Sequence, residues 1–191
     1  MTGSHAKRWV TGIVAVPLLF AVIYFGSEAV FAGLIVLITA VAVLEYNRLV
    51  YGAAGAALPR ALLGFGLLAP LAAAAAGTAA LLAVTVLSTL LVFILTLFDA
   101  REGALDLGPV ARYVLGYLYL PVLLAHFILL RGGDRGVLWI FFVIVLAFSG
   151  DIAAFYVGRT FGRRKLMPRV SPGKTVEGLL GLAAGSVAGC L

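Results

Sequence analysis

The run from Ala61 to Phe98 contains no charged side chain, and this feature restricts the chain to a few kinds of fold. A single helix of that length would reach roughly 55 Å, almost twice the roughly 30 Å of hydrocarbon in a bilayer. We therefore predict two membrane-spanning helices that turn near Gly77 and Thr78, with a kink at Pro70. A proline is tolerated in such a helix because neighbouring helices can satisfy the freed backbone groups.

The composition of the whole chain also indicates a membrane protein. Hydrophobic residues make up 63% of the 191 residues and charged residues only 12%, against roughly 25% charged residues in a soluble domain. The mean hydropathy is +1.15. The apolar runs are continuous, whereas the strands of a membrane β-barrel alternate polar and apolar residues. The sequence thus predicts an all-α, polytopic integral membrane protein. Its single cysteine, Cys190, excludes an intramolecular disulfide and a CxxC site.

The apolar runs together predict about six complete transmembrane helices plus the start of a seventh. They cover residues 10–25, 29–43, 61–98 (two spans), 113–130, 136–157 and 179–191. The small residues around Glu28 resemble a signal-peptide cleavage site, but a second apolar run follows at once. We expect one transmembrane domain over residues 1–191. Because the seventh run is too short to cross a bilayer, we expect the chain to be a truncated part of a longer protein.

The last apolar run carries a regular series of glycines. Gly181, Gly185 and Gly189 lie four residues apart, on one face of a helix. Small residues at this spacing allow helices to pack closely in lipid. The alternative is a flexible end rich in Ala and Gly. We expect a packing ridge for helices that lie outside this chain.

The basic residues between the apolar runs predict the orientation in the membrane. With a cytoplasmic N-terminus, all Lys and Arg residues except Arg131 and Arg135 fall on the cytoplasmic side, as the positive-inside rule requires. We therefore predict a multi-pass protein of the cell inner (plasma) membrane, with the N-terminus and the 159–178 loop in the cytoplasm. This orientation explains the net charge of +6, so no nucleic-acid partner is expected.

The candidate chemistry lies in residues 149–178, where an acid inside an apolar helix is followed by a basic loop. Asp151 is expected about seven residues inside the cytoplasmic end of its helix, roughly 10 Å deep. A carboxylate there costs about 2.5–3.5 kcal/mol on insertion scales, so it needs a partner or a wet cavity. It is either a Mg²⁺ ligand, because hard oxygen donors suit that ion, or a helix cap or structural partner of Arg159. As a metal ligand it would need further donors, from substrate phosphates or from other residues.

The basic loop offers several groups that bind phosphate. Residues Ser171 to Thr175 would place two hydroxyls, the Lys174 ammonium and free backbone amides around a tight turn, and the amino end of the next helix favours phosphate. The Gly-Lys-Thr sequence resembles a Walker A motif. That motif needs glycine where Pro168 stands, and we expect no β-strand before it. Glu177 either caps the amino end of the next helix or is a second metal-binding or proton-handling group.

The remaining polar residues have simpler interpretations. Basic residues next to a membrane helix fix topology and contact anionic headgroups, which we expect for most of Arg159, Arg163, Arg164, Lys165 and Arg169. We expect His126 to make an interhelical hydrogen bond, and Glu45 to be an interfacial acid paired with Arg48. The sequence contains no HExxH motif and no Ser-His-Asp set that would indicate a zinc site or a hydrolase.

Two linked motifs in this stretch closely resemble the phosphatidate cytidylyltransferase family, also called CDP-diacylglycerol synthases. They read DxxAxYxGRxFGRxKL at 151–166 and PxVSPGKTxEG at 168–178. The family carries its Ala-Tyr pair one residue nearer the aspartate, with a hydroxyl residue where Ile152 stands here. The Lys7-Arg8-Trp9 start and the Glu45-Tyr46 helix end also look similar to the family.

The resemblance implies a membrane enzyme of phospholipid biosynthesis. It would join CTP and phosphatidic acid to give CDP-diacylglycerol and pyrophosphate, with Mg²⁺ as cofactor. Asp151 would hold the metal, and Asp151, Lys174 and Glu177 would be catalytic. The substrate-binding residues would be Ser171, Gly173, Thr175, Arg159 and Lys165. Membrane lipid would be a partner, and a homodimer is left open.

The family has a second signature, with His-Gly-Gly and an Asp-Arg-x-Asp type segment, for which this chain has no counterpart. We therefore expect the chain to be inactive by itself. Three other functions fit the sequence. The first is a CTP-dependent polyprenol or phytol kinase. The second is a transporter or ion-pathway segment with Asp151 as an intramembrane ion site. The third is a structural membrane subunit.

Overall fold

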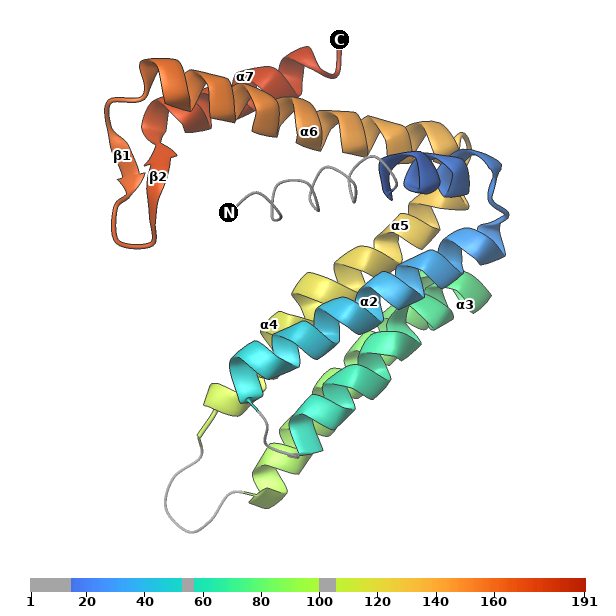
Figure 1. The fold of residues 1–191 in the computed structure, drawn as a ribbon. Helices are drawn as coiled ribbons and strands as arrows, with labels where there is room; N and C mark the ends of the chain where they lie inside the picture. Colours follow the sequence, from blue (N-terminus) through green and yellow to red (C-terminus); the bar gives the residue numbers. More distant parts are fainter. Residues whose placement is uncertain (1–14, 53–56, 100–105) are drawn as a thin grey trace, which may run out of the picture. The chain divides into compact units, whose positions relative to one another are not determined.

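The computed structural model describes residues 15–52, 57–99 and 106–191, and it divides into two compact units, Met1–Asp134 and Arg135–Leu191. The first unit is a bundle of apolar helices (Figure 1). A short helix, Ala15–Phe25, is followed by α2 (Glu28–Tyr51), α3 (Ala57–Asp99), α4 (Gly108–Tyr117), the π-helical turn η1 (Leu118–Val122) and α5 (Leu123–Arg131). The last three form one continuous stretch, Gly108–Arg131.

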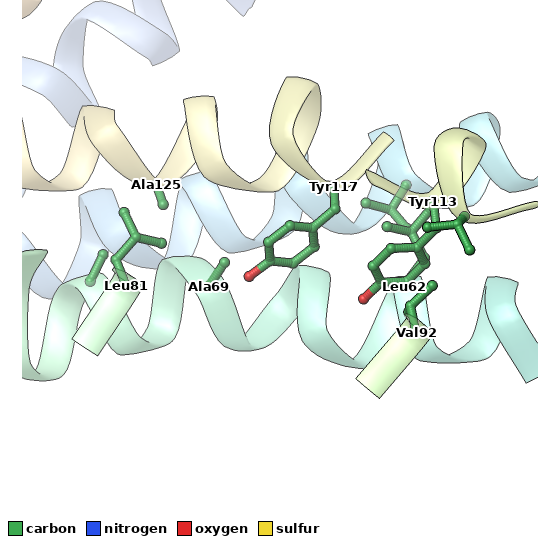
Figure 2. Packing of buried hydrophobic residues seen from close by; sticks show 10 residues of the cluster. Leu62, Ala69, Leu81, Val92, Tyr113, Tyr117 and Ala125 are labelled. Carbon is green, nitrogen blue, oxygen red and sulfur yellow. The ribbon is translucent and has the colours of Figure 1, made fainter. Parts of the chain in front are cut away.

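Helix α3 contains a break that divides it into two segments. Ala76 has φ −144° and Gly77 has φ 71°, and the left-handed value at Gly77 suits a residue without Cβ. Leu62 and Val92, from opposite ends of α3, belong to the same buried cluster, and Figure 2 shows them side by side. The two segments therefore fold back on each other. The predicted turn near Gly77 is confirmed.

The core of the first unit is built around two stacked tyrosines. The ring centroids of Tyr113 and Tyr117 lie 5.9 Å apart with the planes at 6°, and both side chains are fully buried (Figure 2). The Tyr46 hydroxyl donates a hydrogen bond to the Arg112 carbonyl oxygen at 2.7 Å and joins α2 to α4. Large side chains thus fill the space between these helices. The other members of the buried cluster are Val43, Leu62, Ala69, Ala73, Leu81, Val92, Val110 and Ala125.

The second unit is a helical hairpin with a small sheet at its turn. Helix α6 (Gly136–Phe161) is followed by strands β1 (Lys165–Met167) and β2 (Ser171–Thr175), and then by α7 (Val176–Ala188). The strands are antiparallel, and residues 165 and 175 lie opposite each other. Figure 1 shows the strands running across the direction of α6 and α7 rather than continuing along it.

Helices α6 and α7 pack closely because α7 presents glycines. A Cβ atom at Gly181 would lie 2.7 Å from the Val157 Cβ atom, and one at Gly185 would overlap Ala153. Separations this small leave no room for a side chain. The predicted packing ridge is confirmed, but its expected partner is wrong. The ridge packs on α6 of this chain, because a short connection lets the two helices run antiparallel and α6 presents small residues to it.

Four helices are long and apolar enough to cross a membrane: α2, α3, the stretch Gly108–Arg131 and α6. They contain the predicted runs at 29–43, 61–98, 113–130 and 136–157. The helix at Ala15–Phe25 and α7 are shorter, and residues 10–14 of the first predicted run lie outside the described residues. The predicted count of six complete spans plus a seventh therefore stays a prediction.

The chain is mainly helical, as predicted, but it is not all-α. The expectation that Ser171 to Thr175 form a tight turn, with no strand before the next helix, is wrong, because these residues form strand β2. The turn of the hairpin falls at Pro168 to Val170 instead, where the fixed φ of proline suits a turn. Strands this short have no clear periodicity, so the apolar pattern could not indicate them.

Two polar residues of the first unit also differ from expectation. His126 makes its hydrogen bond within its own helical stretch, from Nδ1 to the Val122 carbonyl oxygen at 2.7 Å, and not to another helix. Glu45 is exposed, and the described residues include no ion pair between it and Arg48. Neither residue contributes to the pocket described next.

Candidate functional site

A pocket of about 530 Å³ lies in the second unit, where α6, the β-hairpin and α7 meet. Asp151 and Arg159 come from α6, and Lys174 and Thr175 come from β2. The pocket thus combines one carboxylate, two cations and a hydroxyl with an extended apolar wall. The wall is made by Ala154, Phe155, Leu166, Leu179 and Leu182.

Asp151 lies in the interior of α6, about three turns before its last residue, Phe161. Its side chain is exposed to the pocket and makes no hydrogen bond or ion pair with any described residue. The guanidinium of Arg159 instead lies over the Phe155 ring, 5.9 Å from its centroid. Among the described residues, Asp151 therefore does not form the structural pair with Arg159 that was one of its expected roles. An interior position also excludes a cap.

Thr175 is held in a tight cradle at the start of α7. Its Oγ1 accepts a hydrogen bond from the Gly178 N–H at 3.1 Å, which makes it the N-cap of the helix. A Cβ atom at Gly158 or at Gly162 would lie 3.1 Å or 2.9 Å from this oxygen. The glycines therefore let the buried threonine sit against both helices. Its hydroxyl proton remains able to donate to a ligand.

Glu177 connects the end of α6 to the start of α7. Its carboxylate accepts hydrogen bonds from the backbone N–H groups of Arg163, at 3.0 Å, and Arg164, at 3.2 Å. Its own N–H, followed by those of Arg163 and Arg164, lowers the pKa of the Glu177 carboxyl, because these donors stabilise its charged form. The residue stands in the first turn of α7 and does not line the pocket. Glu177 thus stands at the amino end of the next helix, as predicted for a capping acid, but the N-cap itself is Thr175 and the Glu177 carboxylate binds the N–H groups that follow α6. Its catalytic role stays a prediction.

The structure brings together most of the residues that the sequence singled out, but not all of them. Asp151, Arg159, Gly173, Lys174 and Thr175 line one pocket. The pocket lining does not include Ser171, Lys165 or Glu177, although the first two lie on the same hairpin.

The apolar wall was missed at the sequence level. One signal could have indicated two of its five residues, Ala154 and Phe155. Ala154, Phe155 and Gly158 follow Asp151 at helical spacing and therefore share its face of α6. The contribution of Leu166 depends on the hairpin, which the sequence did not predict.

The described residues include no group of three or more His, Cys, Asp or Glu side chains that could hold a metal ion. Asp151 supplies the carboxylate of the pocket. A lone carboxylate fits Mg²⁺ in sites where substrate phosphates and water complete the coordination of the ion. It does not fit a site made of protein ligands alone.

Comparison with known proteins assigns the chain to a family. The sequence model of the cytidylyltransferase family matches residues 6–191. The phosphatidate cytidylyltransferase of Bacillus subtilis is 37% identical over 103 residues, which is 53% of this chain and 36% of that protein. That of Chlamydia pneumoniae is 33% identical over 104 residues (50% and 32%), and that of Pseudomonas aeruginosa is 56% identical over 39 residues (20% and 14%). The chain thus spans about a third of the length of the first two relatives. No solved structure matches it.

Proposed function

The chain belongs to the cytidylyltransferase family, and we propose that it carries part of an enzyme that transfers a cytidylyl group from CTP to phosphatidic acid. The products would be CDP-diacylglycerol and pyrophosphate. The observation that carries this proposal is the pocket of the second unit, in which Arg159, Lys174 and Asp151 share one cavity with an apolar wall. The relatives of the chain bear names that agree with it.

The make-up of the pocket suits two substrates of different character. Arg159 and Lys174 would attract the triphosphate of CTP and the phosphate of the lipid, because both substrates are anions. The apolar wall, which includes Leu179 and Leu182, would contact the glycerol and acyl parts of phosphatidic acid. A water-soluble anion alone would not need such a wall.

The proposed reaction is a displacement at the α-phosphorus of CTP. An oxygen of the lipid phosphate forms the new P–O bond, the bond between the α-phosphorus and the bridging oxygen breaks, and pyrophosphate leaves with that electron pair. The attacking oxygen is already anionic, so the reaction needs positioning and charge neutralisation more than a base. Lys174 and Arg159 would do this work. A Mg²⁺ ion bound by Asp151 and the phosphate oxygens would add charge neutralisation.

The other predicted residues would support this arrangement. Thr175, fixed by its glycine cradle, would hold the neighbouring Lys174 in place and offer its hydroxyl proton to a phosphate oxygen. Gly173 would let a phosphate approach the backbone, because no atom lies within 4 Å of a Cβ built there. Lys165 and Ser171 would contact parts of a substrate that extend beyond the pocket.

The proposed location follows from the substrates. We place the protein in the inner membrane with the hairpin on the cytoplasmic side, because CTP is a cytoplasmic nucleotide and the basic residues cluster there. A thiol-reactive, membrane-impermeant reagent applied to sealed vesicles of known orientation would test this placement with Arg164→Cys in a Cys190→Ser background, because the Cys190 thiol is exposed.

The reaction itself is tested with CTP labelled at different phosphates. Membranes that contain the full-length gene product are given phosphatidic acid or an isoprenoid alcohol. A cytidylyltransferase transfers the label of α-labelled CTP into lipid and releases that of γ-labelled CTP as pyrophosphate. A lipid kinase transfers only the γ-label. We expect α-label in lipid with phosphatidic acid as acceptor, and γ-label in an isoprenoid alcohol would overturn the proposal.

A further inference from the structure

The β-hairpin and the end of α6 that leads into it carry an unbalanced positive charge. Six Lys and Arg residues occur from Arg159 to Lys174, and this segment contains no Asp or Glu. The next acid along the chain, Glu177, is already bound to backbone N–H groups. Lys165 and Arg169 are exposed and make no ion pair with any described residue. Their charges therefore remain free to attract an anionic partner.

The end of the hairpin is apolar as well as basic. We call residues 167–170 the hairpin tip. Val170 is 79% exposed and Met167 is 47% exposed, and neither lines the pocket. Leu166, by contrast, does line it. The hairpin thus has one side that faces the pocket and a tip whose apolar and basic side chains are both uncovered in the second unit.

The direction of the hairpin shows what its tip could meet. Helix α6 is long and apolar enough to cross a membrane, and the strands run across the direction of α6 and α7 (Figure 1). If α6 crosses the bilayer, a hairpin that leaves its end sideways lies along the membrane surface. Apolar side chains among basic ones are the composition of segments that bind at that surface.

We propose that the hairpin tip docks on the anionic headgroup surface of the membrane that α6 crosses. Val170 and Met167 would enter the interface, and Arg169 would contact lipid phosphates. Each cation near an anionic surface raises the ratio of docked to undocked hairpin about fivefold. Docking would fix the hairpin, and with it one wall of the pocket, at the level of the lipid headgroups.

Fluorescence quenching tests the docking directly. The full-length gene product, with Cys190→Ser and Val170→Cys, is labelled with an environment-sensitive fluorophore and reconstituted in vesicles of phosphatidylcholine and phosphatidylglycerol. The quenchers are a nitroxide-labelled lipid and aqueous iodide. Asp134→Cys, in an exposed turn between α5 and α6 that contains no apolar side chain, is the matched control. We expect several-fold stronger quenching by the lipid at position 170 than at 134, and weaker quenching by iodide.

Two results would overturn the inference. Iodide could quench both positions equally, which would place the tip in water, or neither quencher could reach position 170, which would mean that other protein covers it. A second set of measurements, in which the charge of the protein or of the lipid is changed, tests whether the surface must be anionic. Arg169→Gln, or removal of phosphatidylglycerol, is expected to lower the lipid quenching at position 170, and Arg169→Lys is expected to retain it. Unchanged quenching in both cases would contradict docking on an anionic surface. None of these readouts depends on turnover.

Discussion

The two units of the molecule exclude lipid and water from their interiors in opposite ways. The first fills its core with large side chains, with Tyr113 and Tyr117 stacked at the centre. In the second unit, the buried positions include Gly178 and Gly181. Among the described residues of this unit, Ile140 is the one large hydrophobic side chain that is buried. The packing of the first unit therefore depends on large side chains that fill its interior. The close packing of the second unit depends on glycines, which have no side chain. The second unit also contains the pocket described above.

The difference is sharpest at glycines in the middle of helices. In the first unit, no atom lies within 4 Å of a Cβ atom built on Gly64. In the second, a Cβ atom on Gly185 would overlap Ala153 and lie 2.8 Å from the Ser149 carbonyl oxygen. Glycine is thus replaceable at position 64 and required at position 185, although a Cβ atom at Gly116 of the first unit would also lie 2.5 Å from the Tyr46 ring.

The largest effect is expected from Gly185→Leu. The added side chain has no space and would force α7 away from α6, at a cost of at least about 1–3 kcal/mol together with loss of the pocket. The thermal unfolding midpoint in detergent and the turnover of CTP would both fall. Gly64→Leu, the matched change in the first unit, is expected to alter neither by much. Equal losses from the two variants would contradict the contrast between the units.

The cap of α7 is the next most sensitive feature. Thr175→Val keeps the shape of the side chain but leaves the Gly178 N–H without its acceptor, which should cost about 0.5–2 kcal/mol. Thr175→Ser should recover most of this loss. Thr96→Val is the control in the first unit, because the Thr96 hydroxyl only donates to a helix carbonyl oxygen, that of Val92. Hydrogen exchange at the Gly178 amide would report the loss of the cap, and an unchanged rate would count against it.

A gain of stability is expected from Gly64→Ala. Alanine favours a helix over glycine by about 0.5–1 kcal/mol, and the space at this position is open. Gly181→Ala should instead destabilise, because its Cβ atom would meet Val157. Paired unfolding measurements on the two variants would show changes of opposite sign. If both variants were stabilised, the close packing of α6 on α7 would be refuted.

The smallest effect concerns pH and Glu177. Its pKa is lower in the folded protein than in the unfolded chain, because backbone N–H groups stabilise the carboxylate. The linked stability is therefore fully present above the ordinary Glu pKa, and it is lost as the pH falls through the lowered value. Protection of the Arg163 and Arg164 amides against hydrogen exchange, taken relative to the intrinsic exchange rate at each pH, should fall over that acidic range in the wild type. Glu177→Gln should remove this dependence on pH, and a persisting dependence would assign it to another group.

The sequence predicted the parts of the fold that hydropathy determines. The uncharged run from Ala61 to Phe98 exceeds the thickness of a bilayer, and a glycine near its middle marks the turn at Gly77. The candidate site was predicted in part for a different reason. Asp151 and Lys174 belong to one continuous stretch of chain, so a single hairpin is enough to bring them to one pocket.

Other features depend on contacts that a pattern does not contain. The glycine series at Gly181, Gly185 and Gly189 shows which face of a helix is bare, but it does not show which helix lies on it. The strands of the hairpin are too short for a period of two to appear. The role of Glu177 depends on the backbone N–H groups of Arg163 and Arg164, which only the folded hairpin brings near it. These interactions between neighbouring elements were therefore not predictable.

The most direct test of the central claim, that the pocket of the second unit handles CTP, compares two cations of the basic segment between α6 and α7. Lys174 lines the pocket and Arg164 does not, although both are exposed. Turnover of CTP with phosphatidic acid is measured for Lys174→Ala and Arg164→Ala in the full-length gene product, with equal amounts of folded protein. We predict a loss of about 10²–10³-fold for Lys174→Ala and near wild-type turnover for Arg164→Ala. Equal turnover of the two variants would contradict the account.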